Sequence, residues 1–182
     1  MDKNIEIRTR RLMIRPFSQD YLEEYYRQFT PEITRYQYPE SFPDLRAADR
    51  LVSGFVEEME KGNMLELVIL TPDGEFIGSL EVFGIRKETP EVGLWLKSSA
   101  HGNGYGYEAL ESVLAHLDRT EAYQYYLYEV DVRNLPSVHM VEKFPFEKGG
   151  FEELTTESGK TLKLQTYRVF PQRAGAQTAD KT

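Results

Sequence analysis

Three glycines within five residues, Gly102, Gly104 and Gly106, stand between an extended segment at 91–96 (EVGLWL) and a helix predicted over 104–119. Glycine weakens the start of a helix, so this turn must need the bare backbone. The first N–H groups of a helix have no intrahelical acceptor, and the helix dipole adds partial positive charge there. Strand, glycine-rich turn and helix in this order predict an anion-binding helix N-terminus that a diphosphate can approach.

Two well-known phosphate-binding patterns do not fit this turn. The dinucleotide fingerprint is G-x-G-x-x-G within a parallel βαβ unit, whereas the spacing here is G-x-G-x-G after a segment typical of an antiparallel meander. The P-loop needs Lys and Ser or Thr after its last glycine, and neither follows Gly106. A nucleotide-binding structural domain therefore remains only as a weak alternative.

Hydrophobic periodicity predicts a mixed, mainly antiparallel sheet flanked by helices on both faces, an α/β (α+β) fold. We expect one domain over residues 1–170 and a disordered tail over 171–182. A hairpin is predicted around Pro72-Asp73-Gly74 and another around Ser158-Gly159. The expected elements are strand 10–17, helix 18–29, loop 30–44, helix 44–61, a hairpin within 64–85, strand 91–96, helix 104–119, a β-rich run at 123–132, a short helix at 135–144 and a hairpin over 151–170.

Composition excludes several classes of function. The 182 residues include no cysteine and only three scattered histidines, which argues against disulfides, a thiol nucleophile and a metal site. A net charge of −8 argues against non-specific nucleic-acid binding and slightly favours cationic partners. There is no membrane-spanning run, and the first residues lack the apolar core of a signal peptide. The simplest expectation is a cytoplasmic protein that binds neither nucleic acid nor membrane.

The segment HGNGYGYEAL resembles the pyrophosphate loop of the GNAT superfamily of acetyl-CoA-dependent N-acetyltransferases, in the branch similar to ribosomal-protein N-terminal acetyltransferases. His101 stands where that loop has Arg or Gln, and Gly104 and Gly106 match. The branch also shows an N-x-x-S stretch followed by Lys and Gly-Phe. Asn134, Ser137 and Lys143 match it, with Pro145 in place of glycine. The resemblance covers about residues 10–170.

This resemblance implies acetyl-CoA as co-substrate. Its pantetheine is expected to pair with the main chain of the strand before the loop, and its pyrophosphate to meet the loop amides. Asn134 is expected to bond the pantetheine amide, and Lys143 to reach a phosphate. The implied cofactor-binding residues are Leu94, Trp95, Leu96, His101, Gly102, Asn103, Gly104, Tyr105, Gly106, Tyr107, Asn134 and Lys143; no metal is expected.

Direct attack of an amine on a thioester needs a base for the ammonium and a donor for the departing thiolate. Glu129, five residues before Asn134, corresponds to the catalytic glutamate of the resembled branch. Its apolar strand neighbours would raise its pKa. Glu91, Glu81 or a water chain are the fallback bases. The superfamily's usual tyrosine acid falls at Val141, so Ser137 is the implied hydrogen-bond donor to the sulfur.

The expected function is transfer of an acetyl group from acetyl-CoA to a primary amine, either a protein N-terminus or a small molecule. The loop residues Tyr36, Gln37 and Tyr38 are candidates for lining the acceptor site. A non-catalytic acyl-CoA-binding sensor is the alternative from another class of protein. A homodimer through an exposed sheet edge stays open, because no residue pattern specifies one.

Overall fold

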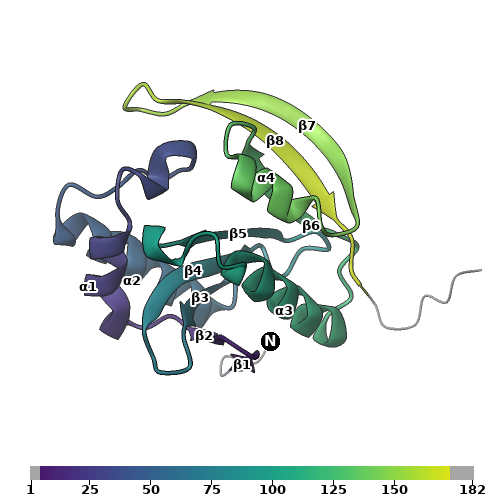
Figure 1. The fold of residues 1–182 in the computed structure, drawn as a ribbon, viewed down its shortest axis with the longest axis horizontal. Helices are drawn as coiled ribbons and strands as arrows, with labels where there is room; N and C mark the ends of the chain where they lie inside the picture. The colour runs from purple at the N-terminus through teal and green to yellow at the C-terminus, as the bar shows by residue number, and fades with distance from the viewer. Residues whose placement is uncertain (1–4, 173–182) are drawn as a thin grey trace, which may run out of the picture.

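An eight-stranded sheet forms the centre of the computed structural model, which describes residues 5–172 (Figure 1). The strand order is β1-β2-β3-β4-β5-β6-β8-β7, and every neighbouring pair is antiparallel except β5 and β6. The strands are β1 (Ile7–Arg8), β2 (Met13–Pro16), β3 (Met64–Leu70), β4 (Phe76–Phe83), β5 (Glu91–Leu96), β6 (Tyr126–Asp131), β7 (Phe146–Thr155) and β8 (Thr161–Val169).

Helices cover both faces of this sheet, which confirms the predicted fold class. Two of them, α1 and α2, lie on one face, and α3 and α4 lie on the other (Figure 1). The helices are α1 (Leu22–Gln28), α2 (Leu45–Lys61), α3 (Tyr105–Thr120) and α4 (Leu135–Val141), with 3-10 turns η1 (Gln19–Tyr21), η2 (Ile33–Tyr36) and η3 (Ser98–Ala100).

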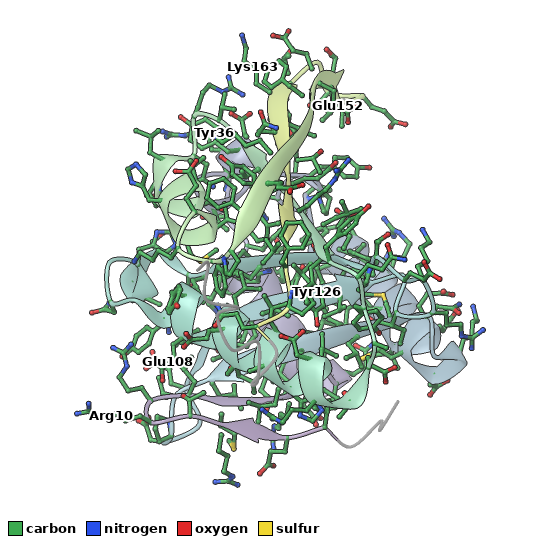
Figure 2. All side chains as sticks on the ribbon, turned by 90° about the vertical axis from the view of Figure 1, so that its right-hand side faces the viewer. Arg10, Tyr36, Glu108, Tyr126, Glu152 and Lys163 are labelled. Carbon is green, nitrogen blue, oxygen red and sulfur yellow. The ribbon has the colours of Figure 1, made fainter. Side chains whose placement is uncertain are left out.

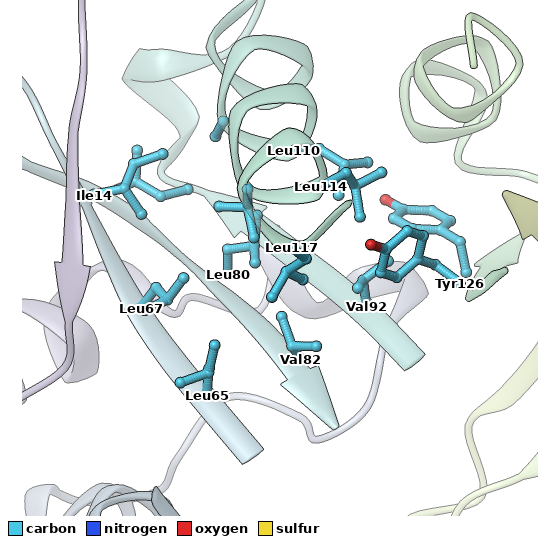
Figure 3. Close-up of a cluster of buried hydrophobic side chains, with 14 of the residues drawn as sticks. Ile14, Leu65, Leu67, Leu80, Val82, Val92, Leu110, Leu114, Leu117 and Tyr126 are labelled. Carbon is cyan, nitrogen blue, oxygen red and sulfur yellow. The ribbon is translucent and has the colours of Figure 1, made fainter. Parts of the chain in front are cut away.

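Two hydrophobic clusters separate these layers, because successive strand residues point to opposite faces. Beneath α3, the side chains of Leu110, Leu114 and Leu117 pack on Leu80 and Val82 of β4 (Figure 3). Beneath α1 and α2 the core is mainly aromatic. Its buried rings belong to Phe17, Tyr25, Phe29, Phe55, Phe76 and Trp95.

Several predicted boundaries differ from the structure, including those of the first predicted strand and the last hairpin. The strand expected over 10–17 is shorter and corresponds to β2, Met13–Pro16. The residues before it form a tight turn after β1, in which the N–H of Thr9 donates to the carbonyl of Leu12. The last hairpin begins at Phe146 rather than at 151, because a register shift between Lys148 and Phe151 interrupts the alternation that marks a strand.

The parallel pair β5–β6 has a single point of pairing, Glu91 with Leu127. On their outer sides both strands are fully paired, β5 with β4 and β6 with β8. The two strands therefore diverge toward their carboxyl ends. We call the space between them, from Gly93 to Leu96 on β5 and from Tyr128 to Asp131 on β6, the strand gap.

Part of the predicted tail, residues 173–182, lies outside the described residues. The N–H of Gln172, near its start, donates to a carboxylate oxygen of Asp118 at 2.9 Å. None of the helices between residues 5 and 172 has the length and apolar character that a membrane crossing requires.

Candidate functional site

Main-chain groups of β5 are available at the strand gap. The N–H of Lys97 donates to Ile77 on β4, and main-chain groups alternate in direction along a strand. The main-chain N–H and carbonyl groups of Leu94 and Leu96 therefore point into the gap. Those of Trp95 point toward β4. The carbonyl of Leu96 already accepts a hydrogen bond from Nε2 of His101 at 2.8 Å. Leu94 is left as the exposed pairing point for an extended ligand.

Glycine is required at the three positions after β5 for two different structural reasons. Gly102 and Gly104 adopt φ values of 76° and 75°, the left-handed region that glycine tolerates best. Gly106 has ordinary φ, but a Cβ there would lie 3.2 Å from Sδ of Met140 and 3.4 Å from Cδ1 of Leu94. The absent side chain lets the first turn of α3 pack directly on α4 and β5.

The N-terminus of α3 has free donors. Gly104 is its N-cap and provides no side-chain bond, while the N–H of Glu108 is the first to reach the carbonyl of Gly104. The N–H groups of Tyr105 to Tyr107 thus have no intrahelical acceptor. Lys143, predicted to meet a phosphate, lies 5.4 Å from the ring centroid of Tyr107 and is exposed. The free N–H donors, the helix dipole and the ammonium group of Lys143 together favour the binding of an anion.

Arg11, which the sequence reasoning missed, fixes this turn from the other end of the chain. Its Nε donates to Glu108 at 2.7 Å and its Nη1 donates to the carbonyl of Asn103 at 2.9 Å. Its guanidinium also lies over the ring of Tyr105 at 4.7 Å. Thr9 adds a hydrogen bond to Glu108 at 2.6 Å. Glu108, noted only as part of a motif, is thereby the anchor of the turn.

We expect Arg11→Met to weaken coenzyme A binding about tenfold, equivalent to ~1.4 kcal/mol, because the turn loses its two side-chain anchors. Arg10→Met is the matched control, because Arg10 is exposed and lies at the periphery of the molecule (Figure 2). Isothermal titration with coenzyme A measures both variants. Equal affinities would contradict a positioning role for Arg11.

Asn134 and Ser137 belong to the start of α4, on the β6 side of the gap. Asn134 is the N-cap of this helix, its N–H donates to the carbonyl of Asp131, and its side chain makes no cap bond. Ser137 lies within the first turn of the helix. Its Oγ is 2.9 Å from the hydroxyl of Tyr128 on β6.

The candidate bases lie on the α1/α2 face of the sheet. Glu129 is exposed and accepts a hydrogen bond from Thr166 at 3.2 Å. Glu81 is partly buried on β4, and burial, followed by the charge of Glu91, raises its pKa to about 7. Burial likewise raises the pKa of Glu91, with a further contribution from Glu129.

Gly93 shows where the Glu81 carboxyl lies. A Cβ at Gly93 would be only 2.7 Å from Oε1 of Glu81, its register partner on the neighbouring strand. The carboxyl therefore lies against the β5 main chain at the entrance to the strand gap. A glycine inside the strand EVGLWL is the sequence signal that could have found this close approach.

Glu66 extends this acidic row into the protein interior. It pairs with Glu81 across β3 and β4, is fully buried, and accepts a hydrogen bond from Ser79. Burial and the charge of Glu81 hold its pKa well above the usual range. Of the two carboxyls, Glu66 is the fully buried one and Glu81 is the one that is partly exposed.

The predicted acceptor-lining loop contacts the β7–β8 hairpin. Nζ of Lys160 donates to the carbonyls of Thr34 and Gln37 at 3.0 and 2.7 Å. Oγ1 of Thr156 donates to Glu40 at 3.0 Å. Tyr36 lies at the same end of the molecule as Glu152 and Lys163 of the hairpin (Figure 2). The loop and the hairpin tip thus meet beyond the open end of the gap.

A groove of about 790 Å³ lies at the other end of β5 and β6. Its lining includes Lys61, Arg86, Lys87 and Glu121, and none of the predicted site residues. The predicted residues are instead brought together around the open end of the strand gap, with Trp95 turned away into the aromatic core.

Comparison with known proteins gives a family match over most of the chain. The family model described as an acetyltransferase (GNAT) domain matches residues 11–147. None of the curated proteins compared with the chain matches its sequence.

Solved structures share the fold. One is RimL, a ribosomal L7/L12 alpha-N-protein acetyltransferase in complex with coenzyme A, at 15% identity and a TM-score of 0.79, covering 91% of this chain and 98% of that one. Another is spermidine N-acetyltransferase from Vibrio cholerae in complex with coenzyme A and spermine, at 15% identity and a TM-score of 0.76, covering 88% and 95%.

Proposed function

Because the chain belongs to the GNAT acetyltransferase family, we propose that it transfers an acetyl group from acetyl-CoA to a primary amine. The family uses acyl-CoA, and the observation that carries the proposal is the strand gap itself. A free main-chain edge at Leu94 leads directly to the uncapped N-terminus of α3. An extended amide-bearing chain that ends in a diphosphate matches these two features in this order.

The residues around the gap divide the chemistry between its two sides. Leu94 and the α3 amides hold the acyl donor, and Asn134 fixes its amide. On the α1/α2 face, Glu81 removes a proton from the ammonium so that the amine can attack the thioester. On the α4 face, Ser137 donates a hydrogen bond to the departing sulfur. Acetyl-CoA supplies the activated acyl group, and no covalent enzyme intermediate is needed.

Glu81 is our preferred base over Glu129, because its carboxyl is partly buried at the gap and its pKa is about 7. A base of that pKa is half ionised near neutral pH and still accepts a proton readily. The role that the sequence resemblance implies for Glu129 stays a prediction, and comparing the Gln variants at both positions decides between them.

The acceptor is a primary amine of either class seen in the similar structures, a protein N-terminus or a polyamine. The exposed and partly buried carboxyls Glu81, Glu91 and Glu129 face the acceptor side and favour a cationic amine. We also propose one catalytic domain over residues 1–170.

Thermal melting tests the cofactor. A ligand at 100 times its dissociation constant that binds only the folded state adds about 2.7 kcal/mol, or a rise of several degrees for a chain of this size. We expect this rise with acetyl-CoA and coenzyme A and none with NAD or ATP. A rise with ATP or NAD alone would contradict the proposal.

Thiol release in the presence of peptide N-termini and polyamines then tests catalysis. We expect release that depends on the amine. Binding of acetyl-CoA without thiol release from any amine would leave the non-catalytic sensor as the function.

A further inference from the structure

Two hydroxyl groups meet where β6 faces α4. The phenol oxygen of Tyr128 lies 2.9 Å from Oγ of Ser137. Tyr128 immediately follows Leu127, the last β6 residue that pairs with β5, so it stands at the closed end of the strand gap. Its ring belongs to the core beneath α3, and its side is opposite to that of Glu129. Ser137 is partly exposed.

The direction of this hydrogen bond follows from burial. Tyr128 is 3% exposed, and Ser137 provides the one side-chain acceptor that the described residues offer its hydroxyl. A buried donor without a partner costs ~1–3 kcal/mol, so the phenol proton points at Ser137. Burial raises the pKa of Tyr128 to about 12, although the hydrogen bond with Ser137 lowers it, and the charge of Glu81 adds a smaller rise; the phenol therefore keeps its proton throughout the neutral range.

Ser137 is therefore an acceptor from Tyr128, and its own proton must point elsewhere. Within residues 5–172, Ser137 donates to no other side chain or carbonyl, although Ser112 of α3 shows that a helical serine can donate to the carbonyl three residues back. The hydroxyl proton of the partly exposed Ser137 is therefore available for a hydrogen bond to a bound ligand.

We propose that Tyr128 is a positioning residue that directs the Ser137 hydroxyl proton into the strand gap, toward the sulfur of the acyl donor. The inference rests on the proposed function. As the amine nitrogen forms its bond to the acyl carbon, the C–S bond breaks and its electron pair stays on sulfur. Ser137 stabilises that negative charge by donating a hydrogen bond, and both hydroxyls keep their protons. The proton that the nitrogen loses as the amide forms goes to the base on the opposite side, after that base has released to solvent the proton it took from the ammonium.

Four variants test this arrangement: Tyr128→Phe, Ser137→Ala, the double variant, and Tyr126→Phe as the matched control. Tyr126 lies two residues earlier on β6, is fully buried in the same cluster, and donates to Asp118 at 2.6 Å. Tyr126→Phe therefore removes an equivalent buried hydroxyl away from the gap. Melting and acetyl-CoA titration are recorded for each.

We expect Tyr128→Phe and Ser137→Ala each to lower kcat about 10- to 100-fold, with the acetyl-CoA KM changed less than about threefold. The double variant is expected to be no slower than Ser137→Ala, because the two hydroxyls act as one unit. Tyr126→Phe is expected to keep the wild-type kcat while losing stability.

The outcomes separate this inference from the function on which it rests. If the wild type acetylates an amine and Tyr128→Phe keeps its kcat, the positioning role is wrong and the function stands. If the losses in kcat multiply in the double variant, or if Tyr126→Phe loses as much kcat as Tyr128→Phe, the positioning role alone would likewise be overturned. If the wild type transfers acetyl to no amine, both fall together.

Discussion

Replacing Glu81 by Gln is expected to lower kcat by about 10²- to 10⁴-fold, the range for loss of a general base, while acetyl-CoA binding is kept. Gln has the same shape, so the contact with Gly93 remains. The wild-type kcat/KM is expected to rise with pH up to about 7 and then level, because Glu81 must be ionised to accept a proton. In the Gln variant that rise is lost.

Neighbouring groups provide the controls. Glu91→Gln removes the negative charge that helps to raise the pKa of Glu81, so the rise in kcat/KM should move to lower pH. On the same side of the sheet, Glu66 of β3 pairs with Glu81 and the phenol of Tyr25 of α1 interacts with its charge, whereas Tyr128 lies on the opposite side. A large loss in Glu129→Gln with full activity in Glu81→Gln would show that Glu129 is the base instead.

Stability tells loss of catalysis from loss of structure. The folded-state pKa of Glu81 is raised, so the native protein binds more protons than the unfolded chain between about pH 4.5 and 7. Its contribution to the free energy of unfolding therefore decreases as pH rises through this window. Glu81→Gln is expected to be more stable than the wild type at pH 8, by ~1–3 kcal/mol. An inactive variant that gains stability is not a misfolded one.

Trp95→Ala is expected to lower the free energy of unfolding by about 3–5 kcal/mol, the usual cost of removing a buried Trp. The ring is 8% exposed and meets Tyr25, Phe29 and Phe76 at centroid distances of 5.1, 5.0 and 5.8 Å. Urea unfolding measures the loss. Leu135→Ala is the control, with a side chain 56% exposed and an expected effect within about 0.5 kcal/mol.

The same position tests how β5 contributes to binding. Trp95→Phe keeps a ring in the aromatic core, so its affinity for coenzyme A is expected to equal that of the wild type. A loss of affinity in Trp95→Phe without loss of stability would show that the indole itself contacts the ligand. The family resemblance includes Trp95 among the cofactor-binding residues, but its side chain points into the aromatic core and away from the gap.

Local patterns made much of the fold predictable. The strand EVGLWL ends at Leu96 as expected, and α2 ends at Lys61, before Gly62, which has the left-handed φ of 71° typical of a glycine after a helix. The glycine turn and the Asn134–Ser137 segment are both at the strand gap. These features depend on neighbours in sequence, so periodicity and turn chemistry reveal them.

The remaining features depend on register between distant segments. Nothing in the motif GYGYEAL indicates that Glu108 binds Arg11, a residue 97 positions earlier. The meeting of Tyr128 with Ser137 needs the exact placement of α4 on β6, and the desolvation of Glu81 needs the pairing of β4 with β5 at Gly93. A family motif predicts which residues belong to the site, but it does not predict which distant residues contact them.

The contact between the hairpin tip and the loop at 34–40 has an entropic consequence for substrate binding. Ordering a free loop costs roughly 1–2 kcal/mol per residue, and a site that must order its loop on binding loses that much affinity. Lys160 and Glu40 hold this loop in place through protein contacts alone. The proposed acceptor side of the gap is therefore preorganised, and an amine that binds there would use its binding free energy to align with the thioester.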